Sequence, residues 1–159
     1  MHLASIPGVR WRLLSDVASP LVGSTGALAY AAQKGLAPDR FDEVDAGLRR
    51  WAVVLTRSTG HDPALATGAG AAGGVGAAAI AALDAHVVSG AEEIAAMVDL
   101  EDRIRRSDLV VTGEGRFDVT SRLGKAPGVV IGLAQRHGVP VHVIAGSIAD
   151  DADRGGIAS

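Results

Sequence analysis

The segment between residues 108 and 144 constrains the fold more than any other part of the chain. Asp108–Thr112 is a short apolar run typical of a buried strand, and Val139–Ile144 is a second such run. Between them, Pro127 suits the first turn of a helix and Gly138 suits its end. Strands joined through a helix in this way are parallel, because the chain crosses over the sheet before the second strand begins. The segment therefore predicts an α/β fold with a parallel sheet.

The connection between the first of these strands and the helix is strongly polar. Residues 113–125 are expected to form a long loop at the carboxyl end of the strand, where open α/β sheets place their ligands. Glycines there let backbone amides approach an anion, cations neutralise phosphate oxygens, and a carboxylate holds a metal ion or accepts a hydroxyl proton. A solvated surface loop whose charges pair with each other is the alternative interpretation. The candidate residues of this loop are Gly113, Glu114, Gly115, Arg116, Asp118, Ser121, Gly124 and Lys125.

One strand and two helices are expected within the first sixty residues. Residues 9–17 read as a strand, and Thr25 is placed to cap a short helix that ends near Lys34–Gly35. A clearer helix starts after Pro38–Asp39, because apolar residues then recur at helical spacing until Gly60.

A glycine-rich run from Gly68 to Gly76 is expected to open an alanine-rich helix that ends at Leu83. The run matches the G-x-G-x-x-G spacing, but the residues before it are turn-rich and do not form the strand that a dinucleotide site needs. A nicotinamide site is therefore not predicted. Two interpretations remain open: a helix N-terminus that binds an anion, or glycines that permit close helix packing.

Two more helices are expected before the parallel unit. Ser89–Glu92 has the spacing of a capping box, and Asp99 is placed to cap another helix that ends near Arg106. Helices thus dominate before Ser107 and the sheet pattern follows it, so a functional boundary is expected near that residue.

Composition and charge exclude several classes of protein. The 159 residues carry a net charge of −3 with no basic run, so nothing indicates nucleic acid or an anionic membrane surface as a partner. The absence of cysteine excludes disulfides and thiolate chemistry. Residues 69–83 form the longest apolar stretch, which is short for a membrane span, and Met1–Ser5 shows no signal peptide. A cytoplasmic protein is expected. A Walker A loop is also absent, because Val119 stands where its first glycine would be.

Four segments, taken together, resemble landmarks of the bacterial glycerate kinase family. They occur in the family's order and at compatible spacing over roughly residues 8–147, which makes coincidence improbable. The signature T-G-E-G-R-x-D followed by G-K-x-P is matched by residues 112–118 and 124–127, the family's glycine-rich segment by residues 68–76, and two further landmarks by residues 23–26 with 33–35 and by residues 16–21.

The resemblance implies transfer of the γ-phosphoryl group of ATP to a hydroxyl of D-glycerate, with Mg²⁺. It also implies two α/β lobes with the active site in the cleft between them. In that architecture residues 1–107 form part of a glycine-rich α/β lobe, and residues 108–159 form part of a Rossmann-like lobe.

Carried over to this sequence, the family's polar centre corresponds to Glu114, Arg116 and Asp118. The resemblance implies that Arg116 binds phosphate or the glycerate carboxylate, and that Asp118 or Glu114 serves the metal or the attacking hydroxyl. No individual metal ligands are assigned. The residues expected to bind substrate or phosphate are Gly113, Gly115, Ser121, Gly124, Lys125, Gly68, Gly70, Gly73, Gly74 and Lys34.

The resemblance is to the C-terminal half of the family, shortened at both ends. The family's first strand, its early loop with lysine and serine, and its last helices have no counterpart here. Two functions are therefore expected in competition: a truncated glycerate kinase, or a catalytically incomplete fragment that acts as a nucleotide- or anion-binding module. A Rossmann-like lobe without its first strands exposes sheet edge, so a homo-oligomer or the missing N-terminal half is the expected partner.

Overall fold

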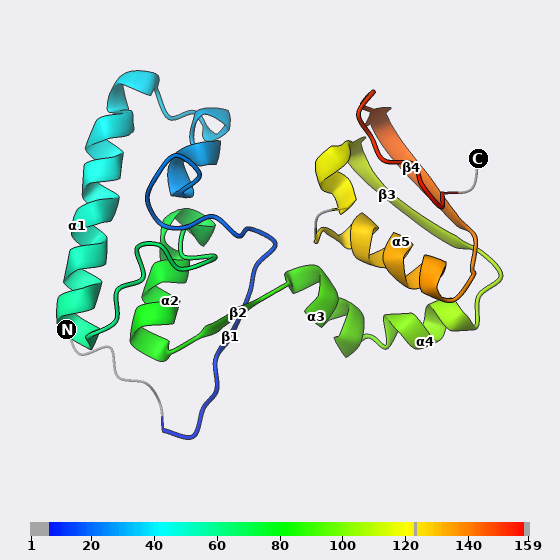
Figure 1. The fold of residues 1–159 in the computed structure, drawn as a ribbon, viewed down its shortest axis with the longest axis horizontal. Coiled ribbons are helices and arrows are strands. Elements are labelled where there is room, and N and C mark those ends of the chain that lie inside the picture. The colour runs from blue at the N-terminus through cyan, green and yellow to red at the C-terminus, as the bar shows by residue number, and fades with distance from the viewer. Residues whose placement is uncertain (1–6, 123, 158–159) are drawn as a thin grey trace. The chain divides into compact units, whose positions relative to one another are not determined.

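The chain folds into two compact units, residues 1–88 and residues 89–159 (Figure 1). The computed structural model describes residues 7–122 and 124–157, so Met1–Ser5, where the sequence shows no signal peptide, lies outside the described residues. The fold is α/β, as predicted, with two short sheets that are each parallel. The lobe boundary expected near Ser107 concerns a complete two-lobe fold and stays a prediction.

The first unit pairs β1 (Arg12–Leu14) with β2 (His86–Val88) in a parallel sheet, with Leu13 opposite Val87. The strand expected over residues 9–17 is therefore shorter than predicted, since only the residues opposite β2 find a partner. β2 was missed because it has only 3 residues, too few to show a period.

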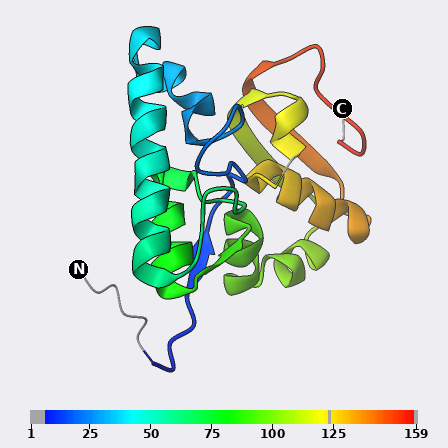
Figure 2. The same cartoon turned by 60° about the vertical axis from the view of Figure 1, so that its left-hand side comes forward.

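Two helices build the core of the first unit, and they lie side by side in both Figure 1 and Figure 2. The predicted long helix is α1 (Phe41–Thr59), which ends at Gly60 with φ of 81°. The predicted alanine-rich helix is α2 (Val75–Leu83). Leu21 and Leu55 are buried between them and the preceding loops, together with alanines of both helices. Small side chains on α2 allow this close packing.

Short 3₁₀ turns also belong to this unit. They are η1 (Ala27–Tyr30), η2 (Ala32–Lys34), η3 (Pro38–Arg40) and η4 (Ala71–Gly73). The helix expected between Thr25 and Lys34 is therefore two 3₁₀ turns, and Thr25 does not cap it, since Gly26 occupies the cap position without a side-chain bond. The predicted end is right, because Gly35 has φ of 87°.

The apolar stretch of residues 69–83 forms η4 and α2 within the first unit. Across residues 7–122 and 124–157, no helix combines the length and the apolar character needed to cross a bilayer.

The second unit contains the predicted strand–helix–strand crossover. β3 (Val110–Phe117) and β4 (Val141–Ile148) are parallel, and α5 (Ala126–Arg136) connects them. α5 lies along the two strands in Figure 1 and Figure 2, and its Ile131 packs with Phe117 and Val141 in the core. η5 (Val119–Arg122) lies between β3 and α5.

α3 (Gly90–Met97) and α4 (Leu100–Arg105) precede β3 and contribute Ala95 and Ile104 to the same core. The capping box at the start of α3 is present in part, because Ser89 Oγ accepts a hydrogen bond from the Glu92 amide at 3.3 Å. Asp99 occupies the cap position of α4 as expected, but with φ of 51° its side chain makes no capping bond. The sequence thus predicts the cap position of α4 correctly, but not a capping hydrogen bond.

The loop predicted over residues 113–125 is wrong in its first part, because β3 continues to Phe117. This polar, glycine-bearing stretch is part of the strand because it pairs with β4. In that pairing Glu114 lies opposite Ala145 and Arg116 opposite Ser147. The approach is close at Gly113, where an added Cβ would lie 2.2 Å from the Ile144 carbonyl oxygen. Only the residues after Phe117 form the connection to α5.

Candidate active site

A cluster of charged side chains surrounds Asp118, directly after the carboxyl end of β3. Asp118 Oδ1 accepts hydrogen bonds from the Thr120 amide at 2.9 Å and from the Thr120 hydroxyl at 2.7 Å. Arg116 Nε lies 3.6 Å from Asp118 Oδ2, and Lys125 Nζ donates to Thr120 Oγ1 at 2.8 Å. One carboxylate and two cations therefore converge at the edge of the sheet where α/β folds bind ligands. Thr120, which links the carboxylate to Lys125, was not singled out from the sequence.

Ser121 fixes the backbone at this point. The side chain is fully buried, and its Oγ accepts a hydrogen bond from the Asp118 amide at 2.9 Å. In return, the Ser121 amide donates to the Asp118 carbonyl at 3.0 Å. This reciprocal pair closes the turn after β3 and holds Asp118 in place. A direct contact between Ser121 and a substrate stays a prediction.

The other predicted residues of this segment lie along β3 and at the start of α5. Glu114 Oε1 is buried and has no hydrogen-bond partner within the described residues. An added Cβ at Gly115 would meet nothing within 4 Å, and Gly124 has φ of 73° just before Lys125, the N-cap residue of α5. A buried carboxylate oxygen without a partner is costly, so Glu114 is suited to a donor or cation that arrives with a ligand.

Oxygen ligands for Mg²⁺ are present, although they do not form a closed cage. Within residues 7–122 and 124–157, no three His, Asp or Glu side chains gather at one point. Mg²⁺ in nucleotide enzymes is commonly held by one or two carboxylates together with substrate phosphates and water. Asp118 supplies one such carboxylate, and the unpartnered oxygen of Glu114, four residues earlier on β3, is a second candidate.

Hydrogen bonding keeps Asp118 ionised. The Thr120 hydroxyl contributes most to a lowered pKa of Asp118, followed by the Thr120 amide, and the charges of Lys125 and Arg116 act in the same direction. Because the folded pKa lies below the unfolded value, this carboxylate stabilises the fold above its ordinary pKa. That contribution is lost as pH falls through the folded pKa.

Replacement of Thr120 with Val is expected to raise the pKa of Asp118, because it removes the largest cause of the lowered value. A pH titration of the Asp118 side-chain carbonyl by ¹³C NMR measures the shift. Thr67→Val, an exposed position in the first unit, is the matched control. An Asp118 titration that is identical in the Thr120 variant and the wild type contradicts this assignment.

The backbone geometry of the glycine run in the first unit requires glycine at several positions. Gly68, Gly73 and Gly74 have φ of 79°, 70° and 103°, and an added Cβ at Gly70 would lie 2.3 Å from the Pro20 carbonyl oxygen. The amides of these four glycines donate to carbonyls of the same unit, at 2.9 to 3.2 Å. Positive φ at three positions and the close approach to Pro20 at Gly70 thus account for these glycines, and their contact with phosphate stays a prediction.

A cavity of about 260 Å³ in the first unit joins two segments that the sequence identified separately. Lys34 lines this cavity from η2, and Gly70 and Gly73 line it from the glycine run. The rest of the wall is mainly apolar and includes Leu28 and Leu48. The structure therefore brings Lys34 and the glycine run together within the first unit.

A larger cavity, of about 770 Å³, lies in the second unit between α3, α4 and α5. Among the predicted site residues, Gly124 lines it, but the residues of the Asp118 cluster do not. The wall carries both acidic and basic side chains and includes small residues such as Ala95 and Gly132. This cavity is thus not the predicted centre.

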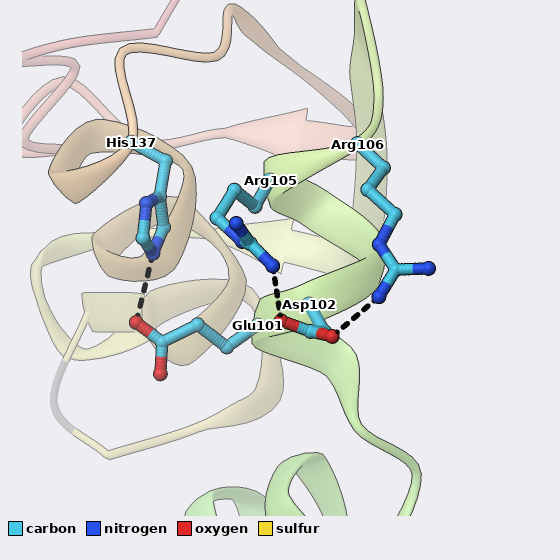
Figure 3. A network of polar contacts seen from close by, with 5 residues as sticks. All are labelled: Glu101, Asp102, Arg105, Arg106 and His137. Atoms are coloured by element: carbon cyan, nitrogen blue, oxygen red, sulfur yellow. Dashed lines mark hydrogen bonds and ion pairs between the residues drawn. The ribbon is translucent and has the colours of Figure 1, made fainter.

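Charges beside this cavity pair with each other, as Figure 3 shows. Glu101 Oε1 lies 2.8 Å from His137 Nε2, which links α4 to the end of α5. Asp102 makes ion pairs with Arg105 at 2.9 Å and Arg106 at 2.7 Å. The hydrogen bond with His137 is the main reason for a lowered pKa of Glu101, and the two arginines lower the pKa of Asp102. Histidine spacing in the sequence had given no sign of this network.

Comparison with known proteins identifies relatives over nearly the whole chain. The sequence profile of the Glycerate kinase family matches residues 2–157. A glycerate kinase of Halalkalibacterium halodurans is 40% identical over 144 residues, which are 90% of this chain and 38% of that protein. A glycerate 2-kinase of Escherichia coli is 42% identical over 141 residues, which are 88% of this chain and 37% of that protein.

A solved structure gives the same result. It is described as a glycerate kinase 2 of Salmonella typhimurium LT2, is 35% identical in sequence, and matches with a TM-score of 0.66 over 88% of this chain and 40% of that one. The chain thus spans less than two fifths of the length of the curated relatives named above, at 38% and 37%. Because the family profile covers residues 2–157 and the relatives are about 40% identical, the chain belongs to the glycerate kinase family.

Proposed function

We propose that this chain acts as a glycerate kinase, transferring the γ-phosphoryl group of ATP to a hydroxyl of D-glycerate. Family membership supports the reaction class. The observation that carries the proposal is the Asp118 carboxylate, held ionised after a parallel strand with Arg116 and Lys125 nearby. The cytoplasm is the proposed location, because the reaction consumes ATP.

Arg116 and Lys125 are proposed to stabilise phosphate charge. The Arg116 side chain is 70% exposed, so its guanidinium is accessible to a phosphate or to the glycerate carboxylate. Lys125 precedes the first turn of α5, where unpaired helix amides also favour an anion. Gly113, Gly115, Gly124 and Ser121 shape the backbone around this point and are proposed to border the bound phosphate.

Asp118 is proposed to orient the attacking hydroxyl. The hydroxyl oxygen bonds to the γ-phosphorus as the bond to the bridging oxygen breaks; ADP leaves with the electron pair, and the hydroxyl proton passes to the Asp118 carboxylate. Mg²⁺, when bound, would neutralise charge on the phosphates, with Asp118 and Glu114 as its proposed protein ligands. Lys34 and the glycines 68, 70, 73 and 74 are proposed as further substrate or phosphate contacts.

Exposed apolar side chains on the sheet of the second unit support the proposal that a partner covers it. Val111 on β3 and Ile144 on β4 are 57% and 70% exposed, although both lie in strands. Apolar side chains on a two-stranded sheet are commonly covered by further strands or helices. A second copy of the chain, or the N-terminal half of the family fold, is the proposed covering.

A binding module without turnover is the second candidate function. It is supported by the exposed Arg116 guanidinium and the Lys125 ammonium, which suit an anion whether or not phosphoryl transfer follows. Such a module would retain an anion site around Arg116 and Lys125 without completing phosphoryl transfer.

Glycerate-dependent ADP release tests the proposal directly. The purified chain is incubated with Mg-ATP, with and without D-glycerate, and ADP is measured by a coupled assay while circular dichroism verifies folding. We expect ADP release that saturates with D-glycerate. A folded chain that binds ATP but releases ADP at the same rate without D-glycerate would instead establish the binding module.

A further inference from the structure

We propose that residues 149–157, drawn in red in Figure 1, form a strap that positions Asp118 for phosphoryl transfer. The strap follows β4 and holds the guanidinium group of Arg122, the last residue of η5. η5 also carries the two hydroxyl groups that hydrogen-bond to Asp118. Asp153 of the strap is therefore a positioning residue, which acts on Asp118 through Arg122 and the η5 turn. The consequence for catalysis rests on the proposed function, whereas the coupling of the strap to the turn does not.

The guanidinium group of Arg122 makes hydrogen bonds to residues that are distant in the sequence. Its Nη1 donates to Asp153 Oδ2 at 2.7 Å and to the Gly155 carbonyl at 2.9 Å. Its Nη2 donates to Gln135 Oε1 at 3.3 Å, and Gln135 Nε2 donates to the same Gly155 carbonyl at 2.9 Å. One guanidinium group thus joins η5, α5 and the strap.

Burial distinguishes this ion pair from those on the surface of the second unit. The Arg122 side chain is 19% exposed, whereas the arginines in the unit's other described ion pairs are 57–72% exposed. Ion pairs between fully solvated side chains contribute little, because water replaces the partner at small cost. A guanidinium group that is largely shielded from water depends more on the acceptors around it. Loss of the Asp153 carboxylate is therefore expected to loosen Arg122.

The strap is itself fixed to the second unit near both of its ends. The Ala149 amide donates to the Phe117 carbonyl at 2.9 Å, where β3 ends. Ala152 and Ile157 pack against the core of the second unit. A segment held at separate points can restrain the side chain that it binds.

The strap also orients the carboxylate that faces Arg122. The Gly155 amide donates to Asp153 Oδ1 at 2.9 Å, which leaves Oδ2 for the guanidinium group. The hydrogen bond from Gly155 is the main reason for a lowered pKa of Asp153, and Arg122 lowers this pKa further. The two side chains therefore meet as a carboxylate and a cation in a fixed geometry.

The backbone of Arg122 transmits this restraint to Asp118. An added Cβ at Gly128 of α5 would lie 2.8 Å from the Arg122 Cα, so the backbone of Arg122 is packed closely against α5. The preceding residue, Ser121, exchanges two hydrogen bonds with Asp118, at 2.9 and 3.0 Å. Contacts of the side chain and of the backbone thus fix the residue next to the turn that holds Asp118.

Amide hydrogen exchange of the full chain, followed by NMR without nucleotide or substrate, tests the strap. Asp153→Asn is expected to increase exchange of the Asp118 and Ser121 amides by about three- to tenfold, because the turn opens more often. The Asp153 side chain is 61% exposed, so solvent screens the pair and limits the effect to this size. Exchange of the amides in the ladder between β3 and β4 is expected to stay unchanged.

A pH titration of the Asp118 carboxyl group by ¹³C NMR supplies a second readout, which a loss of stability alone would not alter. Asp153→Asn is expected to raise the pKa of Asp118, because the bonds from Thr120 that lower it become weaker in a looser turn. Arg122→Met keeps the length of the side chain without its donors and is expected to have the same two effects. The double variant is expected to show no further change, since both substitutions remove one contact.

Asp151→Asn is the matched control, because Asp151 is an exposed carboxylate of the same strap that lies outside the network of Arg122. Exchange at Asp118 and Ser121 that is the same in Asp153→Asn and in the wild type would overturn the strap. An increase of equal size throughout β3 and β4, or in Asp151→Asn, would also overturn it, since neither is specific to the turn.

ADP release separates the strap from the proposed function. In an active chain, Asp153→Asn is expected to lower kcat by about three- to tenfold and to leave KM for D-glycerate unchanged, because Asp118 is less well positioned. Faster exchange at the turn in a chain that releases no ADP supports the strap and contradicts the kinase activity. Glycerate-dependent ADP release in which Asp153→Asn alters neither kcat nor exchange supports the kinase and overturns the strap.

Discussion

Replacement of Asp118 with Asn is expected to lower glycerate-dependent ADP release by about 10²–10⁴-fold, the range typical of general acid–base catalysis. Asparagine has nearly the same shape, and its amide oxygen can still accept the hydrogen bonds from Thr120. The substitution therefore removes mainly the negative charge that faces Arg116. Without this charge, the attacking hydroxyl has no carboxylate to accept its proton. The phosphate site also lacks one proposed carboxylate ligand for Mg²⁺.

Steady-state ADP release, measured over a range of D-glycerate concentrations, distinguishes this effect from weaker binding. We expect the loss in kcat, because the carboxylate acts on the reacting hydroxyl. Asp102→Asn is the control, since Asp102 is an aspartate of the same unit that is also paired with arginines but lies on α4. An Asp118→Asn variant whose kcat stays within about threefold of wild type would show that Asp118 is not at the reacting centre.

Replacement of Gly113 with Ala is expected to lower the free energy of unfolding of the second unit by about 2–4 kcal/mol. The added Cβ would lie 2.2 Å from the carbonyl oxygen of Ile144, which is a backbone atom of the paired strand. Because a backbone atom cannot avoid the clash by changing its rotamer, β3 and β4 must move apart. The ladder that connects the two strands would weaken along its length.

Gly115→Ala supplies a matched control on the same strand. An added Cβ there meets nothing within 4 Å, so we expect stability equal to wild type or slightly higher. Both tryptophans, Trp11 and Trp51, lie in the first unit, so fluorescence reports on that unit alone. Urea unfolding followed by amide hydrogen exchange at β3 and β4 measures the second unit. Equal stability of the Gly113 and Gly115 variants would contradict the close approach at Gly113.

Local signals in the sequence were sufficient for the helices and for the crossover. Gly60 ends α1, Ser89 begins α3, and Pro127 lies in the first turn of α5, as the sequence predicts. Each of these signals acts within one helical turn, because it satisfies or removes a backbone hydrogen bond there. The parallel pairing of β3 and β4 also follows locally, since a helix between two strands leaves little other choice.

The length of β3 depended on its neighbour. Residues 113–116 are polar and rich in glycine, which by themselves indicate a loop, yet β4 runs beside them and provides backbone partners. The same reasoning explains β2, a 3-residue strand that exists because β1 lies opposite it. Strand formation depends on a partner distant in the sequence. A short strand therefore cannot be recognised from the alternation of apolar and polar residues within it.

The sequence by itself determined the family, through four motifs over residues 8–147, and the α/β class, through the crossover over residues 108–144. It also determined the identity of the charged residues around Asp118, because these lie within one short segment. Only the tertiary structure decided which distant groups meet. It places Lys34 and Gly70 in the wall of one cavity, closes the Asp118 turn on the buried Ser121 hydroxyl, and joins Glu101 to His137. Such contacts depend on how whole elements pack, and packing is set by the combined volume and shape of many side chains rather than by any local pattern.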